Sequence, residues 1–315
     1  MAMSNAVLLR KAAGPIGTGD FTAASGLLSA EQSSAFLDRV YVSTPFTQLQ
    51  RSERRRAMVG TIAKMGIGGR ILRAKHAGVD DSVLVKPAFG DVAYAIARYR
   101  VDSEIEEEVF EENIEQEGFE DHWLNTVAGQ VGRDLEDLHF NGDETSLDPF
   151  LSLNRGWLRQ LALSSTAHRI NGATITAGAL SKGHFFGAYE ALPDQYKAQS
   201  DQMRWLMSPT NEARWLEYLT NRATGAGDAA LFGTGATRGP LGIAITTIPS
   251  MPNDRILLSA TKNFIVVYAR EIRYRKTTEG REAIREDKRF YAWFISDDPI
   301  IEEDAGIADI YGLTA

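Results

Sequence analysis

The segment from Asp134 to Leu158 constrains the fold of this chain more than any other part of the sequence. Its first half has apolar residues at three- and four-residue steps, which predicts the end of an amphipathic helix. The helix is expected to stop at Asn141-Gly142, because both residues tolerate a positive φ and so favour a helix end or a tight turn. A polar loop follows, and then a second apolar patch that leads to Trp157. Any helix can end in Asn-Gly, so this segment indicates a particular fold only together with the rest of the chain.

The composition is that of a soluble globular protein. The chain has 315 residues, enough for one large domain or two lobes, and 43% of them are hydrophobic and 24% charged. It contains no cysteine, which excludes disulfides, thiolate metal sites and cysteine nucleophiles. Its 5 histidines fall in no HExxH or HxxxH spacing, and no segment reaches the roughly 18 apolar residues of a membrane span. We therefore expect no metal, no cofactor and no membrane partner, and synthesis in a reducing cytoplasm.

Charge is strongly segregated along the chain. Residues 1–100 carry a net charge of +7, residues 101–150 a net charge of −16, and residues 151–315 a net charge of +1. This segregation is typical of an assembly in which a basic arm of one subunit lies on an acidic face of another. The alternative is a solvated acidic helix face that arose by chance. The residues predicted to meet across the subunit boundary are Arg51, Arg54, Arg55 and Arg56 on the basic side and Glu106, Glu107, Glu108, Glu111 and Glu112 on the acidic side.

The first half of the chain predicts an arm and then a strand-rich excursion. Residues 1–47 contain several glycines and few core-forming clusters, so they read as an extended arm with one short helix at most. Residues 48–98 look like long strands joined by glycine-rich or polar turns, and the alternation in Val92–Val101, with one slip, supports a strand. A long two-stranded unit is marginally stable alone in water. It therefore needs a partner surface, such as a neighbouring subunit.

The second part of the chain predicts a mixture of helices and strands. Acidic residues crowd into 102–121 and precede the helix predicted at Phe119–Phe140, where they suit the helix dipole. Further helices are predicted at Leu180–Ala191 and Thr210–Thr220. The predicted strands are Met203–Ser208, Ile243–Ile248, Arg255–Leu258 and Phe264–Tyr268, followed by a charged hairpin formed by Arg270–Lys276 and Arg281–Phe294 and by a last strand near the C-terminus.

The motifs of common enzymes are absent from the sequence. The glycine-rich GTGATRG has Arg238 where a dinucleotide-binding fingerprint needs its third glycine, and neither a phosphate-binding loop nor a GxSxG elbow occurs. Nothing singles out one acid of the run 104–121 for the desolvation that acid catalysis needs. The arginines at 51–56 could contact nucleic-acid phosphates, but a subunit contact fits an acidic chain better. His184, on an aromatic helix face, is predicted to be a packed core residue. We expect no catalytic residue and no enzymatic activity.

Taken in order, these segments resemble the major capsid proteins of tailed bacteriophages, which have the Hong Kong 97-type shell fold. The segments that carry the resemblance are the arm at Gly26–Phe46, the excursion at 48–98, the long helix closed by Asn141-Gly142-Asp143, RWLMSPTNEARWLEYL at 204–219, GPLGIAITTIPSMP at 239–252 and the terminal YAWFISDDPIIEEDAGIADIYGL. Each motif is weak alone, and their order and spacing carry the identification.

The resemblance implies an L-shaped α+β subunit of the Hong Kong 97-like capsid fold. Its parts would be an N-terminal arm (1–47), an extended two-stranded loop (48–98), a peripheral domain with a long spine helix (99–162 and 253–288) and an axial domain (163–252 and 289–315). It further implies self-assembly, as pentamers and hexamers, into an icosahedral head that encloses double-stranded DNA contacted non-specifically. The implied partners are a portal protein, a separate scaffolding protein and a decoration protein. The protein would be part of the virion and assembled in the cytoplasm of the bacterial host.

Two features depart from many relatives. The 25 residues before Gly26 are too few for a fused scaffolding region, so none is expected. Some relatives crosslink neighbours through a lysine and an asparagine. Lys64, Lys75 and Lys86 could supply the lysine, but neither Asn253 nor Asn263 can be recognised as the asparagine acceptor. We therefore expect a noncovalent shell. The alternatives to a phage capsid are an encapsulin-type compartment shell and, in a different class, a soluble α+β enzyme or ligand-binding protein.

Overall fold

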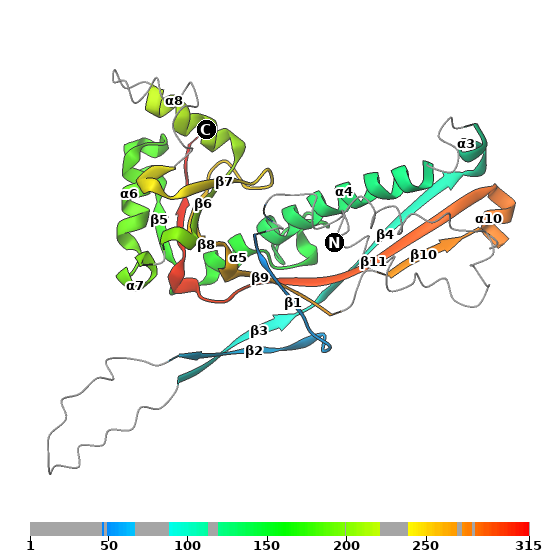
Figure 1. Ribbon diagram of the computed structural model, residues 1–315, viewed down its shortest axis with the longest axis horizontal. Helices are drawn as coiled ribbons and strands as arrows, with labels where there is room; N and C mark the ends of the chain where they lie inside the picture. Colours follow the sequence, from blue (N-terminus) through cyan, green and yellow to red (C-terminus); the bar gives the residue numbers. More distant parts are fainter. Residues whose placement is uncertain are drawn as a thin grey trace, which may run out of the picture.

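The described part of the protein contains two mixed sheets and a projecting two-stranded hairpin (Figure 1). The computed structural model describes residues 46, 49–66, 88–112, 119–198, 200–220, 239–269, 273–278 and 281–314. The predicted arm, apart from Phe46, therefore lies outside the described residues, as do the outer part of the excursion and the glycine-rich loop near Arg238. Within the described part, helices and strands alternate irregularly along the chain, so the predicted α+β class is confirmed.

The first sheet is organised around one long strand, β11 (Lys288–Ile301). Near its start β11 pairs antiparallel with β10 (Arg273–Thr277) and β4 (Ala97–Glu106), and near its end with β9 (Phe264–Tyr268). The short β1 (Arg51–Arg54) extends the sheet in parallel beside β9. The helix α4 (Phe119–Asn141) covers one face, where Ala128 and Val131 pack on Ile105, Tyr291 and Trp293. Two short helices, α3 (Glu107–Glu112) and α10 (Arg281–Glu286), lie at the far end of the sheet.

The second sheet has the order β5, β12, β8, β6, β7. These strands span His168–Asn171, Ala308–Tyr311, Ile256–Ala260, Met203–Met207 and Ala244–Thr247. The helices beside them are α6 (Lys182–Ala191), α7 (Asp194–Lys197) and α8 (Pro209–Thr220). Short 3₁₀ turns span Leu151–Leu153, Gly172–Thr174, Thr176–Gly178, Ser200–Gln202, Pro240–Gly242, Thr261–Asn263 and Asp304–Gly306. Phe185, Trp205 and Trp215 form the aromatic centre of the core of this half.

The two halves share a core at the end of α4. The helix α5 (Trp157–Leu163) starts there, and Trp157 is fully buried among Phe46, Phe140 and Phe264. Its indole Nε1 donates a hydrogen bond to the carbonyl oxygen of Ile300 at 3.0 Å. The same cluster contains Leu206 from the second sheet, so one apolar core joins both sheets.

The predicted end of α4 is confirmed, but the reason given for it was wrong. Neither Asn141 nor Gly142 has a positive φ. Gly142 is needed because a Cβ there would lie 2.6 Å from the carbonyl oxygens of Leu138 and Asn154. A Cβ on Gly156 would likewise lie 2.7 Å from the backbone nitrogen of Gly142. Two glycines therefore let the loop at 154–156 pack directly against the helix end.

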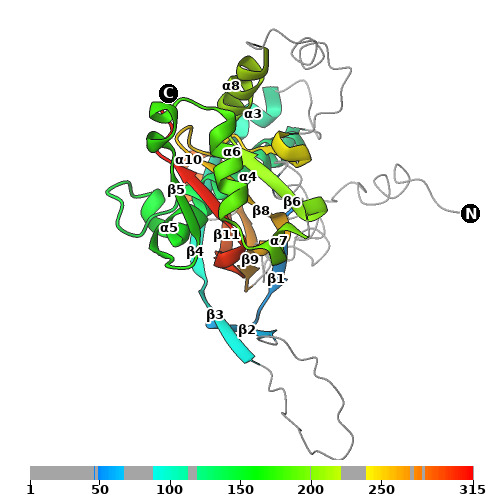
Figure 2. The same ribbon diagram turned by 90° about the vertical axis from the view of Figure 1, so that its left-hand side faces the viewer.

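The hairpin is formed by β2 (Val59–Gly66) and β3 (Ala88–Ala95), which pair antiparallel. Both views show it projecting away from the two sheets (Figure 2). The slip predicted in the strand at Val92–Val101 is a real break, because Ile96 separates β3 from β4. The following strand does not end at Val101, as the sequence predicted, but continues to Glu106, with the acidic side chains on its exposed face.

The other predicted elements are present with small shifts of their ends. The helices predicted at Leu180–Ala191 and Thr210–Thr220 are α6 and α8. The charged hairpin near the C-terminus is present as β10 and β11, but the prediction for its second segment was wrong at the start: Arg281–Glu286 form the helix α10, and the strand begins only at Lys288. His184 is fully buried, as predicted; it completes a capping box with Ser181 and contacts the carbonyl oxygen of Gly172 at 3.0 Å.

Strand pairing divides the chain differently from the predicted domain ranges at two strands. The range 253–288 was assigned to the peripheral domain, yet β8 lies in the sheet with β6 and β12. The range 289–315 was assigned to the axial domain, yet most of β11 lies in the sheet with β4 and under α4. All the strand partners of β11 belong to the first sheet, which periodicity alone cannot reveal.

Candidate assembly surface

The outward face of the hairpin is apolar and exposed. Val59, Met65 and Phe89 expose 72%, 71% and 72% of their surface. Alternate residues of paired strands share one face, so the whole set on this face can be listed. It consists of Val59, Thr61, Ala63 and Met65 on β2 and Phe89, Asp91, Ala93 and Ala95 on β3. Asp91 is the single charge among these eight residues, which is unusual for a face left to water.

The opposite face of the hairpin is anchored at its root. Ile62 and Tyr94 are buried against Ile265, Val267 and Ile300 of the first sheet. Tyr94 lies across Gly60, where a Cβ would be 2.6 Å from the tyrosine oxygen. These contacts fix the root of the hairpin on the body and leave the outward face uncovered.

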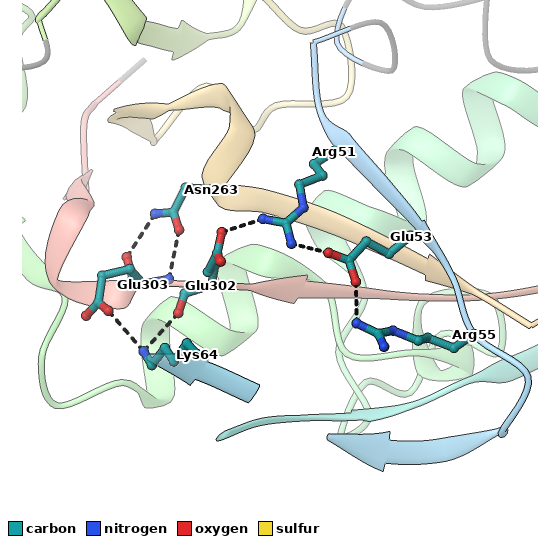
Figure 3. A network of polar contacts seen from close by, with 7 residues as sticks. All are labelled: Arg51, Glu53, Arg55, Lys64, Asn263, Glu302 and Glu303. Atoms are coloured by element: carbon teal, nitrogen blue, oxygen red, sulfur yellow. Dashed lines mark hydrogen bonds and ion pairs between the residues drawn. The ribbon is translucent and has the colours of Figure 1, made fainter. Parts of the chain in front are cut away.

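A polar network holds the hairpin further out (Figure 3). The Lys64 ammonium contacts the Glu303 carboxylate and the Glu302 carbonyl oxygen, both at 3.0 Å. Asn263 positions Glu303 by exchanging two 2.8 Å hydrogen bonds with its backbone. The stem of Lys64 lies over Gly90, where a Cβ would be 3.1 Å from the lysine Cε. Beyond its apolar root, the hairpin is therefore held to the body by polar contacts of Lys64 with Glu302 and Glu303.

Two of the four predicted interface arginines belong to the same network. Arg51 is paired with Glu302 at 2.8 Å and with Glu53, and Arg55 is paired with Glu53 at 2.7 Å (Figure 3). Burial alone would raise the pKa of Glu53, but the hydrogen bonds from Arg51 and Arg55 outweigh it and hold this pKa below its ordinary value. The side chains of Arg54 and Arg56 are exposed.

The predicted acidic residues lie at the far end of the first sheet. Glu107 is held by Arg289, and this hydrogen bond lowers the pKa of Glu107. Glu106 and Glu108 are exposed, whereas the side chains of Glu111 and Glu112 lie outside the described part of α3. The ion pairs that the structure shows for Arg51, Arg55 and Glu107 join none of these residues to the opposite set.

The distance between these two sets follows from the register of β11. Glu106 pairs with Lys288 at one end of this strand, whereas β1 lies beside β9, which joins β11 from Asp297 onward. Nine residues of strand separate Lys288 from Asp297, or about 30 Å at the usual rise per residue. A contact between the two sets requires a second subunit.

Sequence reasoning missed the apolar hairpin face and the network around Lys64. One signal was present in the sequence, because Val59, Thr61, Ala63 and Met65 are apolar or neutral in the phase opposite to Ile62. A strand face of this length without a charged residue is more typical of a covered face than of one left to water. The partners of Lys64 lie more than 230 residues away in the chain, so no local pattern could reveal them.

An open cleft of about 620 Å³ lies between the hairpin and the second sheet, with both Lys64 and Glu303 on its walls. Its wall includes Phe89, Tyr196 and Lys262, so its lining mixes both charges with aromatic rings. Among the described residues, histidine and acidic side chains do not gather in threes as a metal site would need. Within the same residues, none of the helices combines the length and apolarity required to cross a membrane.

Comparison with known proteins identifies the fold. No family model matches the sequence. A putative prophage capsid protein, YqbE of Bacillus subtilis strain 168, is 26% identical over 300 residues, which cover 90% of this chain and 92% of that protein. A subunit of a satellite phage P4 procapsid with its size-determination (Sid) protein superposes with a TM-score of 0.69, at 15% identity over 99% and 98% of the two chains. A capsid subunit of a native GTA particle superposes with a TM-score of 0.59, at 13% identity over 99% and 100%.

The chain has the Hong Kong 97-type capsid fold. The resemblance to tailed-phage major capsid proteins that the sequence predicted is thereby confirmed. A structural, shell-forming role in a virion is the function that the capsid relative and the capsid folds support.

Proposed function

We propose that this chain is the major capsid protein that self-assembles into the icosahedral head of a tailed phage. The observation that carries the proposal is the projecting hairpin with its exposed apolar face. Burying apolar area contributes about 25 cal/mol per Å², so covering Val59, Met65 and Phe89 would stabilise a subunit contact considerably. In a closed shell every subunit has neighbouring copies of the same chain, so a second copy can cover the apolar face of each hairpin.

The charged contact predicted from the sequence remains part of this proposal in a narrower form. Arg51, Arg55 and Glu107 already have partners within their own chain, so the exposed Arg56, Glu106 and Glu108 are the better candidates for a contact between subunits. The roughly 30 Å that separate the sets in one chain support a pairing in trans. Exposed ion pairs contribute only about 0–1 kcal/mol each and weaken with salt, so this contact would tune assembly.

The shell is proposed to be noncovalent. A lysine that attacks an amide must be neutral, and burial is the usual way to lower its pKa. Lys64 is partly exposed and its ammonium already contacts the Glu303 carboxylate at 3.0 Å, so this side chain is neither buried nor turned toward an amide acceptor. Denaturing gel electrophoresis of particles is expected to give one band at the 34.7 kDa of the chain. A ladder of multimers that survives boiling in detergent would contradict this.

The remaining partners are also proposals. They are a portal protein, a separate scaffolding protein, a decoration protein and packaged double-stranded DNA contacted without sequence preference, with assembly in the host cytoplasm and no catalytic role. Heads isolated from the host would contain nuclease-resistant DNA. Enclosed enzymes in place of DNA would favour the encapsulin-type alternative.

The decisive experiment compares assembly of the purified chain with that of a hairpin variant. Sedimentation velocity and negative-stain microscopy should show capsomers or shells of megadalton mass, with scaffolding protein supplied if needed. The double substitution Met65→Asp and Phe89→Asp should leave small species whose thermal unfolding matches that of the parent, because both side chains are exposed. Leu147→Asp, at a fully exposed apolar position outside the hairpin, is the matched control. A parent that stays monomeric at all salt and protein concentrations would refute the proposal.

A further inference from the structure

The strand β4 forms one border of the first sheet. It runs for 10 residues and pairs antiparallel with β11 along its whole length. The strands β10 and β9 pair with β11 from the other side, so β4 lies at the opposite edge (Figure 1). Among the described residues, no strand pairs with the outer side of β4. An edge of this length presents a row of backbone N–H and C=O groups that can pair with another strand.

The cover that α4 gives to the sheet ends before this edge. On the face under α4, Tyr291 and Trp293 of β11 expose only 1% and 0% of their surface. Their cross-strand neighbours on β4, Ser103 and Val101, are only half-buried. The apolar core therefore stops at β4, at a place where one further strand would extend it.

The order of charges along β4 is complementary to its own reverse. Arg98 and Arg100 precede Asp102 and Glu104 at every second position, and all four are exposed. A second copy that pairs antiparallel and is centred on Val101 places Arg98 opposite Glu104. The same register places Arg100 opposite Asp102, and two-fold symmetry repeats both pairs. Parallel pairing in register would instead place each charge opposite its own kind.

Other centres of pairing lose this match. Centring the two strands on Arg100 or on Asp102 places two like charges face to face, which is destabilising. The contacts within one chain leave room for a second partner. Arg100 pairs with Asp102, and their side chains expose 63% and 53% of their surface. Glu104 lies 3.0 Å from Lys288, and its side chain still exposes 55%.

We propose that two copies of the chain pair their β4 strands antiparallel about a two-fold axis at Val101 and so join their first sheets into one. The two Val101 side chains meet on the axis and extend the apolar core beneath α4. One strand pair is smaller than the roughly 1,000 Å² interface of a stable complex, so the contact is weak between free subunits. It goes beyond the proposed function, because it uses a surface other than the hairpin and needs no shell.

A single cysteine tests the position of the axis, because the chain contains none of its own. Val101→Cys introduces one thiol in each copy. Opposed residues of antiparallel strands have Cα atoms about 4.5–5.5 Å apart, which is within the range of a disulfide. Ser103→Cys is the matched control, because Ser103 is half-buried on the same face. In the proposed register its two copies lie four residues apart along the strands, or about 13 Å, too far for a disulfide.

Crosslinking is measured on the full chain with Met65→Asp and Phe89→Asp also present, so that a missing shell is not mistaken for a missing strand pair. Thermal unfolding under reducing conditions verifies that each variant is folded. Nonreducing electrophoresis after treatment with oxidised glutathione, over a series of protein concentrations, gives the yield of dimer. The reducible dimer of Val101→Cys should be roughly tenfold more abundant than that of Ser103→Cys.

Exchange of charges tests the register independently. One Val101→Cys protein carries Arg98→Glu and Arg100→Glu, and a second carries Asp102→Arg and Glu104→Arg. Each protein alone places like charges opposite one another, so its yield of dimer should fall by roughly tenfold. A mixture of the two has opposite charges in all four pairs, and it should recover the dimer as a mixed species identified by mass spectrometry.

Two results would overturn the proposal. The first is equal crosslinking of the two cysteine variants, or crosslinking of neither. The second is a mixture of the two charge variants that crosslinks no better than each protein alone. If Val101→Cys fails to fold, sedimentation of the charge variants without cysteine decides, because the mixture must then associate more strongly than either component. A hairpin variant that still forms shells would count against the proposed function and leave the strand pair to these measurements.

Discussion

The end of α4 and the hairpin differ in how their neighbours hold them. At the end of α4, Gly142 and Gly156 leave no room for even a methyl group, and Trp157 is fully enclosed. In the hairpin, one face is exposed and the outer contact with the body is made by Lys64 and carboxylates. The end of α4 is buried by residues of its own chain. The hairpin is buried only at its root and keeps one apolar face exposed. A protein that must first fold and then assemble needs both kinds of region.

The largest effect is expected from removing the centre of the buried region at the end of α4. Trp157→Ala deletes a fully buried ring and its hydrogen bond to Ile300, so it should lower the free energy of unfolding by about 3–5 kcal/mol. Urea unfolding followed by circular dichroism measures this loss. Leu147→Ala, at a fully exposed position, should stay within about 0.5 kcal/mol of the parent. If both variants lost a similar free energy of unfolding, the end of α4 would be no more tightly packed than an exposed loop.

Gly142→Ala tests whether backbone proximity fixes the helix end. The new Cβ would lie 2.6 Å from two carbonyl oxygens, so the backbone must move, at a cost of about 2–3 kcal/mol. Gly129→Ala is the matched control, because it lies within the same helix and its Cβ would meet only a side-chain nitrogen of Arg133 at 3.9 Å. This control should stabilise the protein by about 0.5–1 kcal/mol, since alanine favours the helix. Calorimetry of both variants distinguishes a conformational role of Gly142 from ordinary helix propensity.

The pH dependence of stability tests the root that joins the two regions, where the Ala95 N–H donates to the Asp298 carboxylate at 2.7 Å. Burial raises the folded-state pKa of Asp298 to about 6, so its stabilising contribution is fully present below its unfolded pKa and is lost as the pH rises through 6. Between pH 7.5 and pH 5.0 the parent should gain about 1–2 kcal/mol relative to Asp298→Asn. Chemical unfolding at both pH values measures the difference. Parallel curves for parent and variant would mean that Asp298 does not titrate in this range.

The smallest effect is expected at the polar contact of the hairpin. Lys64→Met removes a partly exposed ion pair and should cost about 0–1 kcal/mol at low salt and less at high salt. Lys262→Met, in the wall of the same cleft, is the control for loss of a positive charge. Thermal unfolding at two salt concentrations gives the comparison. If Lys64→Met lowered the stability as much as Trp157→Ala, the hairpin would be held to the body as firmly as the end of α4, and the comparison would fail.

The sequence predicted those parts of the fold that local periodicity determines. The helix α4 and the strand β9 have the predicted bounds within one residue, because apolar residues recur along α4 with a helical period and β9 is a short unbroken apolar run. The extension of β4 to Glu106 was missed because glutamates are uncommon in strands, and here they occupy the exposed face. The need for glycine at 142, the partners of Lys64 and the acceptor of the Ala95 N–H depend on residues distant in the chain. These contacts required the structure.

The long strand β11 also has a mechanical consequence. It runs from the end of the sheet where α3 and α10 lie to the root of the hairpin, and it is hydrogen-bonded to β4 along most of its length. A pull on the hairpin directed along β11 loads these hydrogen bonds together in shear, so they share the force. The same pull applied across the strand would break them one after another. The subunit is therefore stiff along one direction and compliant across it, so tension in the hairpin would be carried along the molecule without opening its core.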